Sequence, residues 1–116
     1  MSKILDFAKA RADYHRVAAT SDRAWDNYRK ARDRLAKQRG KFAAEQGFID
    51  ASHAVGRAMS ALDEKEDLLR SACFAEATRE LTSAARARIP FQAPTLEQRE
   101  ARMEEILTAA KLSTGA

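Results

Sequence analysis

A seven-residue repeat over residues 7–42 constrains the fold of this chain more than any other feature of its sequence. With Phe7 as position a of the heptad, the later a positions hold Tyr14, Ser21, Tyr28, Leu35 and Phe42, and the d positions hold Ala10, Val17, Ala24, Ala31 and Gln38. Residues spaced alternately three and four apart share one face of an α-helix. The repeat predicts a long helix whose apolar seam has large residues at a and small residues at d.

The composition also favours long helices. Charged residues make up 33% of the chain and aromatic residues only 7%, and there are 4 glycines and 2 prolines. This balance is typical of helical, coiled-coil-like proteins. A second alternation of three and four, from Phe48 through Val55, Leu62 and Leu69, predicts a second helix. We expect an all-α fold, namely a long antiparallel helical hairpin with a shorter third helix, forming an elongated bundle.

The length of 116 residues suits a single helical domain spanning residues 1–116. Ser2 is the expected N-cap of the first helix, with Asp6 in its first turn. Gly40 could end this helix, but Phe42 keeps the heptad phase, so we place the turn near Glu45–Gly47. The expected elements, in chain order, are a helix at 2–45, a helix at 47–88, a connector at 89–95, a helix at 96–111 and a frayed tail at 112–116.

Two positions leave an alternative to continuous helices. Thr20, Ser21 and Asp22 prefer helix caps to helix interiors, but the heptad keeps its phase across them, which favours one continuous helix. In the second helix, Asp63 and Glu66 resemble a capping box, so a break near residues 62–64 is an alternative. Without a break, Glu66 would either extend to solvent or meet a basic group of the first helix.

The clearest local signal lies before the third helix. Thr95-Leu96-Glu97-Gln98 matches a capping box and follows Pro94. Ile89 and Phe91 of the connector are expected to anchor on the hairpin. The expected buried face of the third helix consists of Leu96, Met103, Ile106, Leu107 and Ala110.

The charge of the chain is unevenly distributed. Residues 1–41 carry 12 Lys and Arg against 5 Asp, a net of +7, whereas residues 42–88 carry 6 against 8, a net of −2. Two interpretations remain open. The basic first helix could lie against acidic parts of the second, or its basic face could be kept for an anionic partner.

The basic run, residues 29–41, is the strongest functional candidate, with seven cations against one acid. Lys30, Arg34, Lys37 and Lys41 are spaced to share one helical face, and Arg32 and Arg39 form a second line beside Trp25. Lys9, Arg16, Arg23, Lys30 and Lys37 recur at position c, away from the seam. The predicted partner-binding residues are Arg16, Arg23, Trp25, Tyr28, Lys30, Arg32, Arg34, Lys37, Arg39 and Lys41.

These features predict a non-catalytic helical interaction protein. Its basic, aromatic-flanked helix would dock on an acidic surface of a larger protein or nucleoprotein assembly, as in an accessory factor or an inhibitor carried by a phage or other mobile element. One alternative is a nucleic-acid-binding module that uses the same cations for phosphate contacts. Another is a coiled-coil homodimer in which the seam pairs with a second chain.

Little in the sequence suggests catalysis, a metal or a cofactor. His15 and His53 lie on different expected helices, and neither has a second ligand three or four residues away. Cys73, the only cysteine, lies on the apolar face of the second helix and is expected to be buried and inert. No apolar run approaches the length of a membrane span, so we expect a cytoplasmic protein with no membrane partner.

Overall fold

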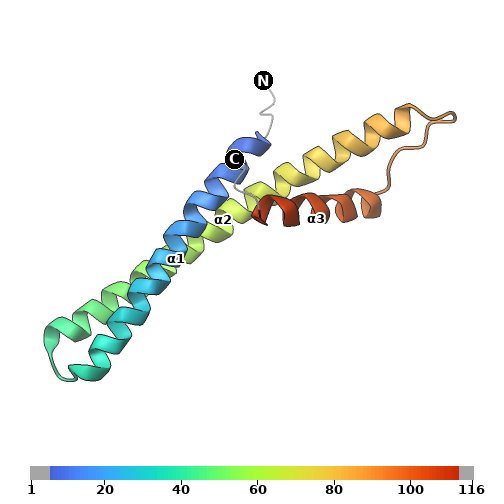
Figure 1. Ribbon diagram of the computed structural model, residues 1–116. Coiled ribbons are helices and arrows are strands. Elements are labelled where there is room, and N and C mark those ends of the chain that lie inside the picture. Colours follow the sequence, from blue (N-terminus) through green and yellow to red (C-terminus); the bar gives the residue numbers. More distant parts are fainter. Residues whose placement is uncertain (1–5, 113–116) are drawn as a thin grey trace. The chain divides into compact units, whose positions relative to one another are not determined.

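The computed structural model describes residues 6–112, and within this range it contains three helices and no strand. These are α1 (Phe7–Lys37), α2 (Phe42–Arg86) and α3 (Leu96–Leu112) (Figure 1). The predicted all-α class with a shorter third helix is therefore confirmed. The predicted N-cap at Ser2 and most of the predicted frayed tail lie outside the described residues.

Asp6 caps the start of α1. Its carbonyl oxygen accepts a hydrogen bond from the Ala10 N–H at 2.9 Å, and its carboxylate accepts one from the Lys9 N–H at 3.2 Å. This side-chain bond satisfies a donor that has no partner inside the helix. α1 then continues through Thr20–Asp22, as predicted from the heptad phase. Thr20 is accommodated because its hydroxyl donates to the carbonyl of Arg16.

The turn between α1 and α2 lies at residues 38–41, so the prediction of a turn near Glu45–Gly47 is wrong. Gly40 has φ +81°, a left-handed conformation that ends a helix and that side chains other than glycine resist. The heptad seam therefore stops at Leu35. Gln38 lies in the turn, and Phe42, predicted on the seam, is 78% exposed at the start of α2.

α2 runs without interruption through residues 62–64, so the alternative of a break is wrong. Glu66 is a charged residue on the apolar face of α2. Its carboxylate accepts a hydrogen bond from the Lys111 ammonium group at 2.7 Å and lies 3.8 Å from the Arg70 guanidinium. The cation that meets Glu66 from another helix therefore comes from α3, and the expectation of a basic group from the first helix is wrong. Because its carboxylate is paired, Glu66 can lie on the partly buried face of α2 without interrupting the helix.

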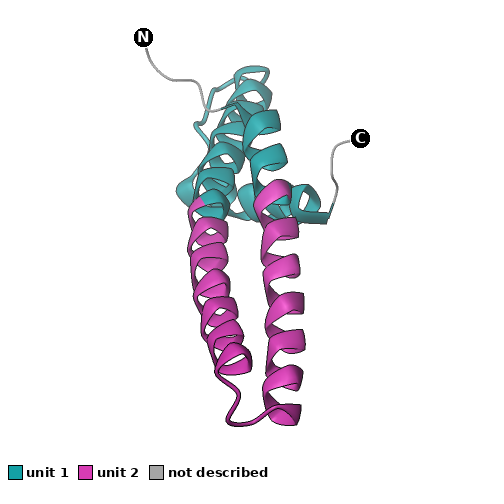
Figure 2. Cartoon of the chain, turned by 90° about the vertical axis from the view of Figure 1, so that its left-hand side faces the viewer, with its two compact units in different colours: residues 1–15, 65–116 teal, residues 16–64 magenta. Residues whose placement is uncertain are grey.

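The chain divides into two compact units, shown in Figure 2, and each is described by itself. Unit 1 consists of residues 1–15 and 65–116, and unit 2 of residues 16–64. The expectation of a single domain stays a prediction. Unit 2 is an antiparallel hairpin, with α1 from Arg16 onward lying beside α2 up to Glu64. Its buried residues are Val17, Ser21, Ala44, Val55 and Ala58.

Unit 1 is built from parts of all three helices. Its core joins one face of α2 to one face of α3, with the start of α1 packed against both. The buried core residues are Leu69, Cys73, Ala77, Met103, Leu107 and Ala110, and Phe7, Ala10 and Tyr14 pack on them. Ion pairs also link these helices, including Arg70 with Glu104 at 2.6 Å and Arg102 with Glu80 at 3.1 Å.

α3 begins with the predicted capping box. The Gln98 N–H donates to the Thr95 hydroxyl at 3.1 Å, and the Thr95 N–H donates to the Gln98 side-chain oxygen at 2.9 Å. The expectation that Ile89 and Phe91 anchor on the hairpin is wrong, because Ile89 is 100% exposed and Phe91 is 52% exposed. Leu96 is exposed as well, since the face of α3 that reaches the core begins more than one turn later, at Met103.

Candidate interaction surface

All ten predicted partner-binding residues lie in unit 2, within residues 16–41. Nine of them are exposed, and Tyr28 is half-buried. Eight lie on α1, whereas Arg39 and Lys41 lie in the turn. Lys41 therefore does not share the α1 face of Lys30 and Lys37, and Arg39 does not continue a helical line from Arg32. The early end of α1 is the physical reason for both differences.

The cations of residues 23–41 have only local partners in the described structure. Arg29 pairs with Asp26 at 2.6 Å, and Arg32 lies 3.6 Å from its neighbour Asp33. Arg23 donates to the hydroxyl of Thr20, and Arg34 to the side-chain oxygen of Gln38. The structure records no ion pair for four further cations of this segment, which are Lys30, Lys37, Arg39 and Lys41.

None of the ion pairs recorded for residues 23–41 reaches α2. Unit 2 has four carboxylates on α2, and all of them are exposed: Glu45, Asp50, Asp63 and Glu64. The structure records no ion pair between any of them and these cations. In unit 1, by contrast, cross-helix ion pairs join α2 to α3. Within unit 2, the basic face is thus not neutralised by the acidic part of α2, and its charge is directed to solvent.

Trp25 lies at the edge of a small aromatic cluster in unit 2. Its indole N–H donates to the Met59 sulfur at 3.4 Å, and its ring meets Tyr28 edge-on with centroids 5.6 Å apart. Tyr28 in turn contacts Phe48 of α2, with centroids 5.3 Å apart. Trp25 nevertheless remains 39% exposed. An aromatic side chain that is held in place and still accessible can contact a partner at little cost in conformational entropy.

A shallow hollow of about 340 Å³ lies beside Trp25 on α1. It is lined by Asp22, Arg23, Trp25, Asp26 and Arg29. Charges of both signs therefore surround the exposed indole. This arrangement suits a mixed polar and aromatic protein contact better than a row of phosphates, which the two carboxylates would repel.

Sequence reasoning missed one exposed apolar feature of unit 2. Phe42 and Ile49 lie seven residues apart on α2 and are 78% and 46% exposed. The heptad phase predicts Phe42 on the buried seam, although the glycine two residues earlier is a signal that the helix ends. The structure therefore places an exposed phenylalanine directly beside the cations of the turn.

The groups considered for catalysis do not form a reactive site among the described residues. The His15 ring nitrogen Nε2 lies 2.7 Å from the carbonyl oxygen of Ala110 in unit 1, so this half-buried imidazole has a structural partner. His53 is exposed in unit 2. Cys73 is fully buried, and this burial raises the pKa of its thiol to about 11. Residues 6–112 contain no cluster of His, Cys, Asp or Glu that could hold a metal ion.

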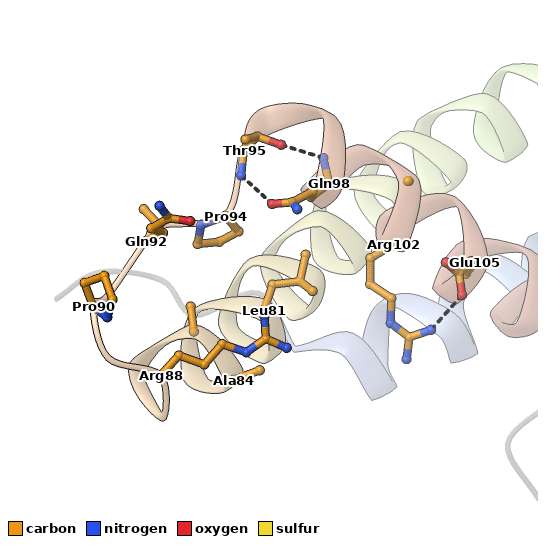
Figure 3. A pocket seen from close by; sticks show the side chains of 13 residues that line it. Leu81, Ala84, Arg88, Pro90, Gln92, Pro94, Thr95, Gln98, Arg102 and Glu105 are labelled. Carbon is orange, nitrogen blue, oxygen red and sulfur yellow. Dashed lines mark hydrogen bonds and ion pairs between the residues drawn. The ribbon is translucent and has the colours of Figure 1, made fainter.

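A larger cavity of about 550 Å³ lies in unit 1, between the end of α2, the connector and the start of α3 (Figure 3). Two pairs of its lining residues are hydrogen-bonded to each other. Thr95 and Gln98 form the capping box, and Arg102 donates to Glu80 and Glu105, each at 3.1 Å. The bond to Glu80 raises the pKa of Arg102 above its ordinary value. Arg88 and Gln92 also line the cavity, and the structure records no side-chain hydrogen bond or ion pair for either of them.

The chain matches no protein family model, no curated protein and no solved structure. None of the helices in residues 6–112 is long and apolar enough to cross a lipid bilayer.

Proposed function

We propose that this chain is a non-catalytic interaction protein that docks the exposed basic face of unit 2 on an acidic surface of a larger protein or nucleoprotein assembly. One observation carries the proposal. The cations of residues 23–41 are exposed, and none of them is paired with the carboxylates of α2. Charge that the fold does not neutralise is available to attract and orient a partner of opposite charge.

The partly exposed Trp25 supports a protein partner. Tryptophan and arginine are enriched among the residues that dominate protein interfaces, and Trp25 lies beside both Arg23 and Arg29. Asp22 and Asp26 flank the same indole. They would oppose a continuous phosphate backbone, but they can pair with basic groups at the rim of a protein interface.

The test compares three fluorescently labelled polyanions of equal charge. The first is a peptide rich in Glu with no apolar residue larger than alanine, and the others are single-stranded and double-stranded oligonucleotides. Anisotropy titrations at ~50 and ~200 mM salt give their affinities. We expect the chain to bind the acidic peptide, and we expect the triple variant Lys30/Lys37/Lys41→Glu to lose this binding.

A matched control is the triple variant Arg57/Arg86/Arg88→Glu. It produces the same change in net charge at exposed positions outside residues 23–41, and it should keep the binding. An equal loss of affinity for the peptide in both variants would show that only net charge matters, and unchanged affinity in the Lys30/Lys37/Lys41→Glu variant would show that these cations are not used. Either result would refute docking through this face. Binding to DNA with a loss of ~10³–10⁵ in affinity between the two salt concentrations, and no binding to the peptide, would instead identify a nucleic-acid-binding module.

A further inference from the structure

The tip of the unit 2 hairpin, which we define as residues 37–42, carries three exposed cations. These are Lys37 at the end of α1 and Arg39 and Lys41 in the turn. The structure records no ion pair for any of them, and the sequence has no acidic residue between Asp33 and Glu45. The tip is therefore a compact region of uncompensated positive charge, which is complementary to a cluster of carboxylates.

An exposed apolar ridge adjoins these cations. Phe42 is the first residue of α2 and is 78% exposed, and Ile49 follows two turns later with 46% of its surface exposed. A spacing of seven residues puts both side chains on one face of the helix, about 10 Å apart. The combination of a largely exposed phenylalanine, a second apolar side chain on the same face and unpaired cations beside them is suited to an aromatic anchor within a protein interface.

The backbone of the turn holds this arrangement in a defined conformation. The Gln38 N–H donates to the Arg34 carbonyl at 2.9 Å, and the Lys41 N–H donates to the Gln38 carbonyl at 3.2 Å. Gly40 adopts the left-handed backbone conformation that reverses the chain direction between α1 and α2. A surface that is ordered before binding loses less conformational entropy when a partner binds.

The start of α2 also lacks a side-chain cap. The carbonyl oxygen of Lys41 accepts the N–H groups of Ala44 and Glu45, but a lysine side chain cannot accept a hydrogen bond. The N–H groups of Phe42 and Ala43 have no acceptor inside the helix. A carboxylate from outside would meet these donors and the positive end of the helix dipole. This adds to the preference of the tip for acidic groups.

We propose that the tip inserts Phe42 into an apolar pocket of a partner protein, and that carboxylates around this pocket pair with Lys37, Arg39 and Lys41. The inference rests on the function proposed above, because it assumes an acidic protein partner, and it adds the anchor residue and the shape of the partner surface. Glu45 lies between Phe42 and Ile49 on the same helix. A protein groove can place a basic or hydrogen-bonding group opposite this single carboxylate, whereas the continuous negative charge of an anionic lipid surface would repel it, and this favours a protein groove over a membrane.

The experiment uses two labelled peptides that have the same Glu residues in the same positions. One is the acidic peptide described above. The other carries leucines spaced three and four apart, so that it forms an acidic helix with an apolar stripe. We expect the wild-type chain to bind the striped peptide more tightly, and Phe42→Ala to abolish this preference. Burying one phenylalanine corresponds to roughly a tenfold to hundredfold difference in affinity.

Phe91→Ala is the matched control, because Phe91 is also an exposed phenylalanine but belongs to the connector of unit 1. It should keep the preference for the striped peptide. Phe42→Leu should keep most of it, since leucine is also apolar. Circular dichroism checks that each variant retains its helices.

The outcomes separate this inference from the proposed function. Equal affinity for the two peptides, unchanged by Phe42→Ala, would overturn the inference and leave the proposed function in place. No binding to either peptide at low salt would overturn both. If the striped peptide is not preferred, two other results are informative. Phe42-dependent binding to phosphatidylserine vesicles would assign the tip to a lipid surface, and Phe42-dependent self-association in sedimentation would assign it to a second copy. Either result would overturn the inference.

Discussion

Replacing Gly40 with alanine tests whether the structure places the helix reversal correctly. Gly40 has φ +81°, and a Cβ built at this position meets no atom within 4 Å. Any loss of stability in Gly40→Ala must therefore come from the backbone conformation, because no steric contact is added. No other residue of the described chain, glycine or not, has a positive φ.

The expected loss follows from two opposing effects. Holding an L-residue in the left-handed region costs ~1–2 kcal/mol relative to glycine. The alanine also lowers the conformational entropy of the unfolded chain, and this effect favours folding by ~0.4–1 kcal/mol. We therefore expect Gly40→Ala to lower the free energy of unfolding by about 0.8 kcal/mol at the middle of these two ranges, and by at most about 1.6 kcal/mol.

Gly47→Ala and Gly56→Ala provide controls within the same unit. Both glycines lie inside α2, and a Cβ at either position meets no atom within 4 Å. Alanine is favoured over glycine in a helix by ~0.5–1 kcal/mol, so both variants should be more stable than wild type. Urea unfolding followed by circular dichroism gives the free energies of unfolding for all three variants.

The signs of these changes decide between the two turn positions. With a turn at residues 38–41, only Gly40→Ala destabilises the protein. With the turn near Glu45–Gly47, as the heptad phase predicts, Gly47→Ala would be destabilising and Gly40→Ala would be stabilising. A stabilising effect of Gly40→Ala, or an effect no more destabilising than that of Gly47→Ala, would refute the placement of the turn at residues 38–41.

Four further predictions concern unit 1. Thr95→Ala should lower the free energy of unfolding by ~1 kcal/mol, because it removes the hydroxyl that accepts the Gln98 N–H in the capping box. Amide exchange in the first turn of α3 should become faster, and unchanged exchange would contradict the role of the cap. Cys73 should react very slowly with thiol reagents at pH 8 until the chain unfolds, because a pKa of about 11 leaves only ~0.1% thiolate, and fast reaction of the folded chain would show that the thiol is accessible. Since its folded pKa lies above the ordinary value of 9.0, its contribution to stability should be complete below pH 9 and lost as the pH rises to about 11. A double-mutant cycle of Glu66→Ala and Lys111→Ala should give a coupling of only ~0.5–1 kcal/mol that shrinks in high salt, since both side chains are about a third exposed; no coupling would mean that the ion pair is not maintained in solution.

The sequence predicted the helical class, the continuity of α1 and the capping box, because these depend on local periodicity and local hydrogen bonds. The exposed positions of Lys30 and Lys37 were also predictable, since position c of the heptad points away from the seam. The end of α1 was predicted wrongly because two local signals disagreed. The position of Phe42 in the heptad favoured a longer helix, whereas Gly40 favoured a helix end. The left-handed conformation of Gly40 decides the outcome, and α1 ends at Lys37.

The partners of the charged residues could not be predicted from the sequence. Glu66 meets Lys111 across 45 positions of the chain, and this contact exists only because α3 packs on α2. The absence of ion pairs between the basic run and α2 has a similar origin. It depends on which faces of two helices are turned toward each other, and counts of charge do not determine this.

Unit 1 is built from two separate segments of the chain, and this affects which residues can be replaced without changing its core. Its core is encoded on both sides of residues 16–64, whereas unit 2 is one uninterrupted segment. All ten predicted partner-binding residues and the tip belong to that segment. If the proposed function is correct, replacing residues 16–64 should change the partner that the chain binds, while every core residue of unit 1 stays the same.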